Sequence, residues 1–313
     1  MQHLLSMHDL DKKQMIALFD RADYFLKTAV AKQSVLDILH GKVVVNVFFE
    51  PSTRTRNSFA IAANRLGAIV LSPNMKNSST TKGELLIDTI NNLAAMGASI
   101  LVIRHPDNHF TQFLALEAQT KVSIINAGDG SNEHPTQALL DILTIRQHFS
   151  DFSKLTVAIV GDVSHSRVAR SLVIGLKKMG TTQIRFIAPD YFIPENQDET
   201  YQSVEIFHDI DKGLHGVDII YDLRIQKERI DEKKRPEDEK YFKMFGLTLE
   251  RVALAKPTAI VMHGGPINRG IEITSEVADG PQSVILQQTR NSVALRMAVL
   301  EAVVWDQGSG ISQ

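Results

Sequence analysis

The sequence predicts an α/β protein of two doubly wound domains, each with a central parallel sheet flanked by helices. Nearly continuous runs of apolar, often β-branched residues recur from residue 40 onward, and segments with helical length and periodicity separate them. Strands that are buried on both faces have this composition. The series of runs restarts near Leu155, and 313 residues are long enough for two domains of ordinary size.

The first series of strands and helices predicts the first parallel sheet. Its strands are expected at residues 42–49, 68–71, 99–103 and 122–126. Its helices are expected at about 53–66, 84–96 and 110–120. Alternation of strand and helix is typical of a parallel sheet, because each crossover connection needs a helix.

The second series predicts the second sheet. Its strands are expected at residues 156–160, 183–187, 217–221, 259–262 and 284–286. A helix at 135–149 joins the two series, and a last helix is expected at about 291–305. Residues 231–240 are charged at every position except Pro236, which predicts a solvated loop. We place the first domain at residues 1–134 plus 291–313 and the second at residues 135–290.

Composition excludes several classes of protein. The net charge of −2 gives no overall positive field to attract nucleic acid. The absence of cysteine excludes disulfides, thiolate zinc sites, iron–sulfur clusters and a catalytic thiol. No apolar run approaches the roughly 18 residues of a membrane span, and the first residues do not have the pattern of a signal peptide. We therefore expect a cytoplasmic protein that binds neither nucleic acid nor membrane.

Hydroxyl and guanidinium groups follow the first predicted strand. The segment consists of Ser52, Thr53, Arg54, Thr55 and Arg56. It lies where a helix begins, with Ser52 as a natural N-cap. A helix N-terminus offers backbone N–H groups and a partial positive charge, so this segment can hold a phosphate group. The P-loop pattern is absent. The alternative is a capped surface helix with solvated arginines.

Two further strand ends of the first domain carry polar residues. Arg104 follows the strand predicted at 99–103, and a glycine-rich loop after the next strand leads to His134, Thr136 and Gln137. Ligands of open α/β sheets bind at the carboxyl ends of strands. We expect these side chains to contribute to one site, the alternatives being an exposed structural arginine and a structural histidine.

The second domain shows the same arrangement. Gly161-Asp162 follows a predicted strand, but the dinucleotide pattern G-x-G-x-x-G is absent, so Arg167 in this turn is better suited to a carboxylate. Polar segments also follow the strands predicted at 217–221 and 259–262, and plain loops are the alternative for both. These segments contain Arg224, Gln226, Arg229 and the run from His263 to Arg269.

The histidines do not suggest a metal site. His105 and His109 are four residues apart, but acidic or thiol partners at useful spacing are lacking, and neither H-E-x-x-H nor G-x-S-x-G occurs. We expect no metal and no organic cofactor.

Together these segments resemble the aspartate/ornithine carbamoyltransferases, from about residue 45 to about residue 300. The Ser-Thr-Arg-Thr-Arg segment stands in register with Arg-His-Pro, His-Pro-Thr-Gln, Gly-Asp-x-x-x-x-Arg and Arg-x-Gln-x-Glu-Arg. The His-Cys-Leu-Pro and Asp-x-x-x-Ser-Met-Gly segments of the ornithine enzymes are absent. The resemblance therefore favours the aspartate enzymes of this family.

The resemblance also implies roles for individual residues. Those expected to hold carbamoyl phosphate are Ser52, Thr53, Arg54, Thr55, Arg104, His134, Gln137, Gly265 and Pro266. Those expected to act in catalysis are Arg54, Thr55, Arg104 and His134. Those expected to bind aspartate are Lys82, Arg167, Arg224 and Gln226.

Three further features follow from the same resemblance. Ser78 and Lys82 match a loop that a neighbouring subunit inserts into the site. Glu50 and Arg229 match a pair that bridges the domains on closure. Gly264 replaces the proline that is usual in the family, which we expect to loosen this loop.

The implied reaction is transfer of the carbamoyl group from carbamoyl phosphate to L-aspartate, a step of pyrimidine biosynthesis. A shared site implies a closed ring, expected to be a homotrimer. The resemblance leaves a regulatory chain and a dihydroorotase open as further partners. The alternatives are a carbamoyltransferase for ornithine or a related amine, a non-catalytic assembly partner, and a nucleotide-binding module.

Overall fold

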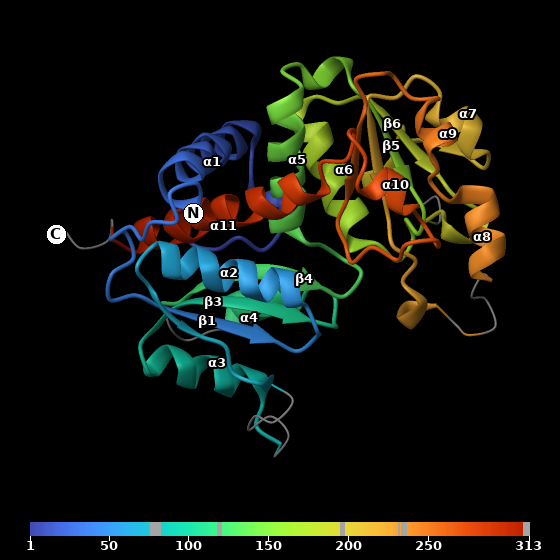
Figure 1. Ribbon diagram of the computed structural model, residues 1–313. Helices are drawn as coiled ribbons and strands as arrows, with labels where there is room; N and C mark the ends of the chain where they lie inside the picture. The colour runs from blue at the N-terminus through green and yellow to red at the C-terminus, as the bar shows by residue number, and fades with distance from the viewer. Residues whose placement is uncertain (76–82, 118–120, 195–197, 231, 233–236, 309–313) are drawn as a thin grey trace. The chain divides into compact units, whose positions relative to one another are not determined.

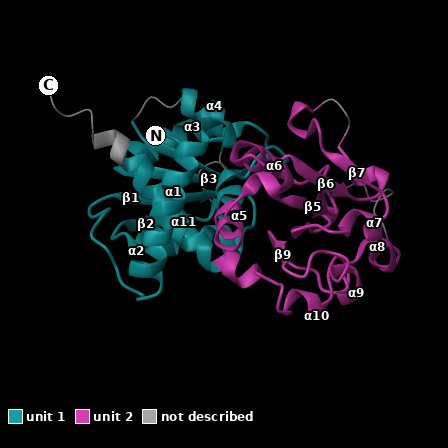
Figure 2. Ribbon diagram, turned by 90° about the horizontal axis from the view of Figure 1, so that it is seen from above, with its two compact units in different colours: residues 1–140, 290–313 teal, residues 141–289 magenta. Residues whose placement is uncertain are grey.

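The structure is a computed structural model that describes residues 1–75, 83–117, 121–194, 198–230, 232 and 237–308 (Figure 1). The chain forms two compact units (Figure 2). Unit 1 consists of Met1–Leu140 and Arg290–Gln313, and unit 2 is Asp141–Thr289. Each unit contains one parallel sheet flanked by helices, which confirms the predicted fold class.

Unit 1 contains a four-stranded sheet in the order β2-β1-β3-β4. The strands are β1 (Val43–Phe48), β2 (Ile69–Leu71), β3 (Ala98–His105) and β4 (Ser123–Asp129). The helices that lie at least partly in this unit are α1 (Lys12–Phe25), α2 (Thr53–Arg65), α3 (Leu86–Ala95), α4 (Phe110–Glu117), α5 (Pro135–His148) and α11 (Ile285–Gly308), with short turns η1 (Met7–Asp9) and η2 (Leu26–Val30). The chain passes between the units within α5 and within α11.

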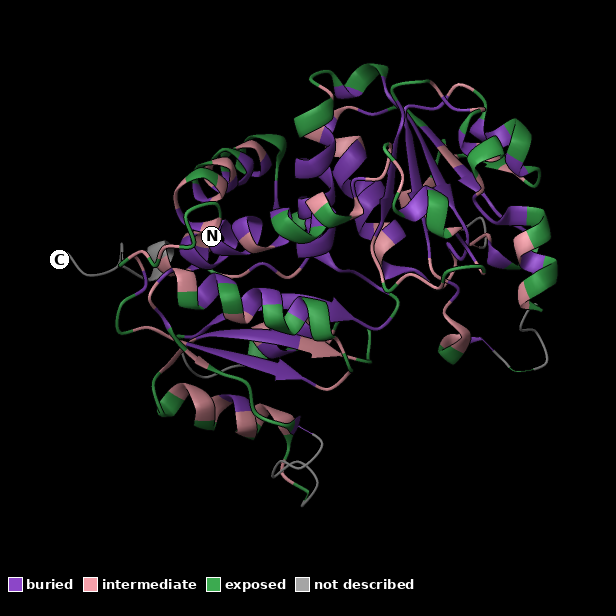
Figure 3. Cartoon of the chain, viewed as in Figure 1, coloured by how far each residue is buried: buried purple, intermediate pink, exposed green. Residues whose placement is uncertain are grey.

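Helices cover both faces of this sheet (Figure 1). On one face, Ile90 of α3 and Leu114 of α4 pack in a cluster with Val47, Ile103 and Ile124 of the strands. On the other face lies α2, whose Phe59 ring contacts the Arg296 guanidinium of α11 at 4.9 Å. Figure 3 shows most of β1, β3 and β4 as buried, as their apolar runs predict, whereas Ile69 and Leu71 of the edge strand β2 are exposed.

Unit 2 contains a five-stranded sheet in the order β7-β6-β5-β8-β9. The strands are β5 (Thr156–Val160), β6 (Gln183–Ile187), β7 (Glu205–Phe207), β8 (Ile219–Asp222) and β9 (Ile260–His263). The helices are α6 (Arg167–Met179), α7 (Ile210–Leu214), α8 (Asp238–Phe245), α9 (Leu249–Val252) and α10 (Ser275–Ala278), with short turns η5 (Phe152–Lys154), η6 (Asp190–Phe192), η7 (Glu199–Tyr201) and η8 (Lys227–Arg229).

Helix α6 shows how local sequence sets an element. Its N-cap Ser166 accepts a hydrogen bond from the backbone N–H of Ala169, and Gly180 ends the helix with a φ of 110°. Glycine adopts this left-handed conformation without strain. The helix therefore begins at Arg167, directly behind the turn that follows β5.

The predicted strand at 284–286 is wrong. The backbone there makes one short bridge to β9, in which Val261 N–H donates to Gln282 O and Val284 N–H donates to Val261 O. The chain then turns into α11 at Ile285, and Leu286 is 84% exposed. The three apolar residues are thus the end of a bridge and the start of a helix, which begins earlier than the expected residue 291.

Two other predictions need correction. Strand β7 was not expected, because its three residues are partly exposed at the edge of the sheet. The charged stretch at 231–240 is not all loop, since α8 begins at Asp238. Residues 231 and 233–236 of that stretch lie outside the described residues. No helix in the described part of the chain combines the length and apolar content that crossing a bilayer requires.

Candidate active site

The segment after β1 forms the first turn of α2. Ser52 occupies the N-cap position, but among the described residues its hydroxyl accepts no hydrogen bond from the helix backbone. Ser52 is thus the N-cap residue, as expected, but without a capping bond from its side chain. Thr53 and Arg54 are exposed, whereas Thr55 is buried. The first turn thus presents hydroxyl and guanidinium groups at a helix N-terminus, where anions bind favourably.

Arg104 connects three neighbouring strand ends. It is the residue of β3 that lies opposite Phe48 of β1 in the sheet. Its Nε lies 3.1 Å from Oε2 of Glu50, which follows β1, and its Nη1 donates to the carbonyl of Ala127 in β4 at 3.2 Å. Arg104 is therefore held at the carboxyl ends of β1, β3 and β4, next to the segment that leads into α2.

The residue after Arg104, His105, packs between two phenylalanine rings. The ring of His105 stacks on Phe110 at 3.7 Å between centroids and meets the edge of Phe49 at 5.0 Å. Burial lowers the pKa of His105 below its ordinary value, which favours the neutral ring. The neighbouring Phe49 N–H donates to the Arg104 carbonyl at 2.9 Å.

The loop after β4 is organised by one buried carboxylate. Asp129 accepts hydrogen bonds from the side chains of Asn126 and Asn132 at 2.8 and 2.9 Å. It also accepts bonds from the backbone N–H groups of His109 and Glu133 at 2.7 and 3.1 Å. Four donors around a buried carboxylate compensate for its lost hydration. The loop is therefore fixed where it enters α5.

His134 and Gln137 lie at the start of α5. The helix begins at Pro135, whose fixed φ suits a first helical position. Both side chains are buried, and Gln137 N–H donates to the His134 carbonyl at 3.0 Å. Since β1, β3 and β4 are parallel neighbours, unit 1 brings Ser52, Thr53, Arg54, Thr55, Arg104, His134 and Gln137 to one edge of its sheet.

In unit 2, Asp162 organises the predicted carboxylate-binding segments. It follows β5, is fully buried and accepts a hydrogen bond from His165 Nδ1 at 2.7 Å. Its other oxygen accepts the backbone N–H of Gln226 at 3.1 Å. The side chains of Gln226 and Arg229 both donate to the carbonyl of His165, at 2.7 and 3.1 Å. The turn after β5 and the segment after β8 are therefore one hydrogen-bonded body.

Two arginines lie next to this network in the chain, Arg167 directly after Ser166 and Arg224 two residues before Gln226. Arg167 is the first residue of α6 and is buried. Arg224 is paired with Glu228, with Nη1 donating to Oε2 at 3.0 Å and Nη2 donating to Oε1. This pairing raises the pKa of Arg224, and although burial alone would raise the pKa of Glu228, the bonds from Arg224 lower it. The pair is thus fully ionised at neutral pH.

The loop after β9 is tied to a buried polar chain. His263 N–H donates to Gln288 Oε1 at 3.0 Å, and Gln288 Nε2 donates to Asp141 Oδ1 at 2.8 Å. The phenol of Tyr221 donates to the other oxygen of Asp141 at 2.7 Å. The loop continues through a cis peptide bond between Gly265 and Pro266, with Gly265 N–H bonded to His263 Nδ1 at 2.6 Å. Gly265 and Pro266 therefore lie on a braced loop at the carboxyl end of β9.

A second buried group of titratable residues lies beneath this loop. Asp222 and His263 end neighbouring strands in register, and His263 Nε2 is 4.0 Å from Asp222 and 3.5 Å from Glu272. Burial and then the charge of Glu272 raise the pKa of Asp222 well above its ordinary value. Burial likewise raises the pKa of Tyr241.

Two expected features, the loop from a neighbouring subunit and the bridge between Glu50 and Arg229, stay predictions. Ser78 and Lys82 lie outside the described residues. Glu50 is paired with Arg104 in unit 1, and Arg229 is bonded to His165 in unit 2, so each side chain has a partner within its own unit. The bridge between Glu50 and Arg229 stays a prediction.

The sequence did not point to three residues that shape the sites. Glu228 was not expected to pair with Arg224, although the i, i+4 spacing of opposite charges is a signal for it. The sequence indicated that Asp129 and Asp162 lie in loops, but not that their carboxylates hold these loops in place through hydrogen bonds. Their signal is an acidic residue inside a glycine-containing turn, which readily accepts local backbone N–H groups.

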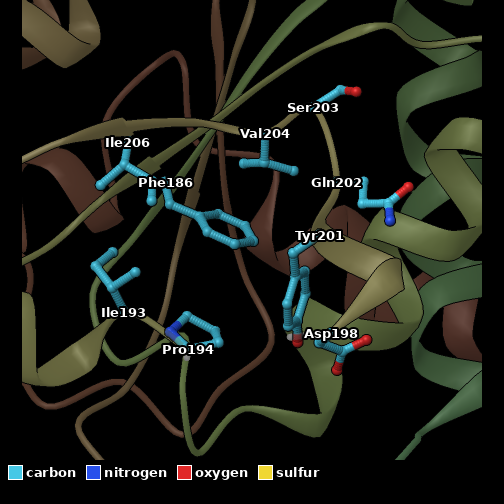
Figure 4. Close-up of a pocket in the computed structure, with 9 residues that line it drawn as sticks. All are labelled: Phe186, Ile193, Pro194, Asp198, Tyr201, Gln202, Ser203, Val204 and Ile206. Carbon is cyan, nitrogen blue, oxygen red and sulfur yellow. The ribbon is translucent and has the colours of Figure 1, made fainter. Parts of the chain in front are cut away.

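A separate cavity of about 230 Å³ lies in unit 2, near the edge of the sheet (Figure 4). Phe186, Tyr201 and Asp198 are among its lining residues, and burial raises the pKa of Tyr201 to about 12. None of the predicted site residues within the described ranges lines it. In those ranges, no group of three or more His, Asp or Glu side chains is arranged to hold a metal ion.

Comparison with known families and structures gives one consistent result. The model of the aspartate/ornithine carbamoyltransferase carbamoyl-P binding domain matches residues 2–147, and that of the Asp/Orn binding domain matches residues 153–303. Two similar structures are of aspartate transcarbamoylase from Trypanosoma cruzi, one with N-(phosphonacetyl)-L-aspartic acid and one with carbamoyl phosphate and aspartate. Each is 31% identical with a TM-score of 0.85, covering 97% of this chain and 95% or 97% of the other.

Ornithine carbamoyltransferase from Thermus thermophilus is also similar, at 25% identity and a TM-score of 0.83 over 97% of this chain and 99% of that chain. Both domain models match in chain order and together span most of the sequence. The chain belongs to the aspartate/ornithine carbamoyltransferase family.

Proposed function

We propose that this chain transfers the carbamoyl group of carbamoyl phosphate to the amino group of L-aspartate, giving N-carbamoyl-L-aspartate and phosphate in pyrimidine biosynthesis. The observation that carries the proposal is the placement of Arg104, which contacts residues at the ends of β1 and β4 beside the first turn of α2. The similar T. cruzi protein was solved with carbamoyl phosphate and aspartate.

In this proposal, unit 1 holds carbamoyl phosphate. The first turn of α2, with Ser52, Thr53, Arg54 and Thr55, binds the phosphate through hydroxyl, guanidinium and backbone N–H groups. Arg104, His134 and Gln137 bind the carbamoyl group. The loop carrying Gly265 and Pro266 in unit 2 supplies backbone contacts.

The reaction is acyl transfer to an amine. The aspartate nitrogen attacks the carbamoyl carbon, a tetrahedral oxyanion forms, and the C–O bond to phosphate breaks. Thr55, Arg104 and His134 stabilise the oxyanion, and a single such donor contributes about 100-fold to 1,000-fold in rate. Arg54 and the helix N-terminus stabilise the departing phosphate, which also accepts the amine proton. No protein nucleophile takes part, and orientation of the substrates supplies further rate enhancement.

Two arginines of unit 2 favour aspartate over ornithine. Arg167 begins α6 directly after the turn that follows β5, and Arg224 lies two residues before Gln226, whose side chain donates to that turn. Aspartate carries two carboxylates that guanidinium groups recognise well, whereas ornithine ends in an ammonium group. Because the arginines suit aspartate better, a carbamoyltransferase for ornithine or a related amine is only the second candidate.

The remaining expectations belong to the same proposal. A neighbouring subunit supplies Ser78 and Lys82 to the site, Lys82 binds aspartate, and three chains form a closed ring. Light scattering on the purified protein should give about three times the mass of 34.8 kDa. A monomer with full activity would contradict the shared site. The proposed location is the cytoplasm.

A direct assay tests the function. The protein is incubated with carbamoyl phosphate and either aspartate or ornithine in the presence of a chelator, and carbamoylated product is measured. We expect product from aspartate alone. Product from ornithine alone would favour the second candidate, and no product from either amine would reject both.

Arg54→Ala tests the phosphate site. This exposed residue lies in the first turn of α2, so its loss should leave the unfolding temperature unchanged and lower kcat by about 100-fold or more. Arg290→Ala, an exposed arginine in the same unit, is the matched control. Equal turnover of the two variants would count against the assignment of Arg54.

A further inference from the structure

Glu133, the residue before His134, is hydrogen-bonded to Asp129 through both its backbone N–H and its backbone carbonyl. Glu133 N–H donates to Asp129 Oδ1 at 3.1 Å, and the Glu133 carbonyl accepts the N–H of Asp129 at 3.1 Å. The backbone of Glu133 therefore has its donor and its acceptor occupied by one residue.

The first residues of the chain run along β4 and reach the same loop. Leu4 N–H donates to Ile124 O at 3.0 Å, and Asn126 N–H donates to Leu4 O at 2.8 Å. Asn126 Nδ2 donates to Leu5 O at 2.8 Å. The segment is thus paired with β4 as a further strand would be, although only one bridge forms.

The carboxylate of Glu133 joins the loop to this segment. Its Oε1 accepts from the Ser6 hydroxyl at 2.5 Å, and its Oε2 accepts from the Met7 backbone N–H at 2.8 Å. Glu133 is 3% exposed, and Ser6 and Met7 are buried too. A buried carboxylate is stable only with such donors. Since Ser6 also begins η1 with a capping box to Asp9, the donors are themselves held in place.

We infer that Glu133 is a positioning residue for His134: it fastens the loop before α5 to residues 6 and 7, so that the His134 ring is held in the geometry that carbamoyl transfer needs. The inference rests on the proposed function of His134. The carboxylate of Glu133 is bonded to Ser6 and Met7, so we assign it a positioning role and not a part in the chemistry. A catalytic side chain displaced by about 1 Å can lose about 100-fold in rate, so the fastening has a measurable effect.

A double-mutant cycle tests this inference in the full-length protein. Glu133→Ala should lower kcat by about tenfold to 100-fold and leave the KM for aspartate unchanged. In a His134→Ala background, adding Glu133→Ala should change kcat by less than about twofold, because the ring it positions is gone. An equal loss in both backgrounds would overturn the inference.

Glu133→Gln is the conservative variant. Its amide oxygen accepts from Met7 N–H and its NH₂ donates to Ser6 Oγ, so we expect most of the lost turnover to return. Loss as severe as in Glu133→Ala would contradict the hydrogen-bonding argument. Glu301→Ala is the matched control, since this largely buried carboxylate pairs with Arg21 at 2.5 Å elsewhere in unit 1 and should reduce stability without reducing kcat.

A second measurement is independent of activity. Hydrogen exchange of peptides covering residues 126–137 should accelerate in Glu133→Ala and stay near the wild-type rate in Glu133→Gln. Unchanged exchange in Glu133→Ala would overturn the positioning role. If His134→Ala kept full turnover, the proposed function would fail, while the exchange result would still decide the role of Glu133.

Discussion

The phenol of Tyr221 leaves no room for a side chain at Gly264, because a Cβ added to Gly264 would lie 2.9 Å from the phenolic oxygen. The phenol cannot easily move, because it is buried and donates to Asp141 at 2.7 Å. Gly264, where the family usually has proline, therefore lies against a phenol that requires a residue without a side chain. Position 264 accepts only glycine while Tyr221 keeps this hydrogen bond.

Gly264→Ala should destabilise the protein by about 1–3 kcal/mol, because the added methyl group would collide with the buried phenol of Tyr221. In a Tyr221→Phe background the cost of the same substitution should be smaller. The closest atoms that remain among the described residues are Val168 Cγ1 at 3.6 Å and the ring carbon Cζ at 3.9 Å, which are ordinary contacts. Urea unfolding of the four proteins measures both costs. Equal costs in the two backgrounds would show that the phenol is not the obstacle.

Arg224→Ala should raise the KM for aspartate by about tenfold or more and leave carbamoyl phosphate binding unchanged. The reason is that a bidentate guanidinium contact to a carboxylate contributes several kcal/mol when it is partly buried. Arg224 lies in unit 2, after β8, and holds Glu228 in the absence of substrate. Steady-state kinetics measure the first effect and calorimetry with carbamoyl phosphate the second.

The matched control for Arg224 is Arg269→Ala. Arg269 also pairs with a carboxylate of unit 2, since its Nη1 and Nη2 donate to Asp279 at 2.7 and 2.8 Å. Both partners are well exposed, so loss of this pair should change little. If Arg224→Ala abolished carbamoyl phosphate binding instead, its role would be misassigned.

The pH dependence of stability should report on Asp222. Its pKa is raised in the folded protein by burial and by Glu272, so the folded state keeps a proton that the unfolded chain has lost. Stability therefore falls as the pH rises above the unfolded pKa of about 3.9, and it stops falling above the folded pKa. Asp222→Asn has no such proton to lose.

The free energy of unfolding of Asp222→Asn, relative to wild type, should accordingly increase with pH across that window. One proton accounts for a slope of up to about 1.4 kcal/mol per pH unit. Urea unfolding of both proteins between pH 4 and pH 8 measures the difference. Parallel pH profiles would mean that Asp222 ionises equally in both states.

The strand ends that carry the candidate sites could be predicted from the sequence. Buried parallel strands are continuous apolar runs, and polar residues such as Arg104 and His134 then stand out where each run stops. The same rule misled at Val284, since three apolar residues also suit a helix start. The partners of these residues were not predictable. Asp129 accepts hydrogen bonds from residues as far apart in the sequence as His109 and Glu133. Which donors reach it depends on the conformation of the loops, and the amino-acid composition does not determine that.

Asp162→Ala should weaken the use of aspartate although Asp162 need not touch it. The carboxylate bonds to the Gln226 N–H and to His165, whose carbonyl in turn holds the side chains of Gln226 and Arg229. Without it the segment after β8 loses its connection to the turn after β5. We expect the KM for aspartate to rise about tenfold while the KM for carbamoyl phosphate stays constant.

Asp162→Asn separates hydrogen bonding from charge at this position. Its remaining oxygen can accept from Gln226, whereas its NH₂ faces His165 and must donate to the ring nitrogen. We therefore expect Asp162→Asn to keep the bond to Gln226 and to raise the KM for aspartate by less than Asp162→Ala does. Steady-state kinetics of the two variants measure this. Equal KM values for Asp162→Asn and Asp162→Ala would show that the bond to Gln226 does not hold the segment.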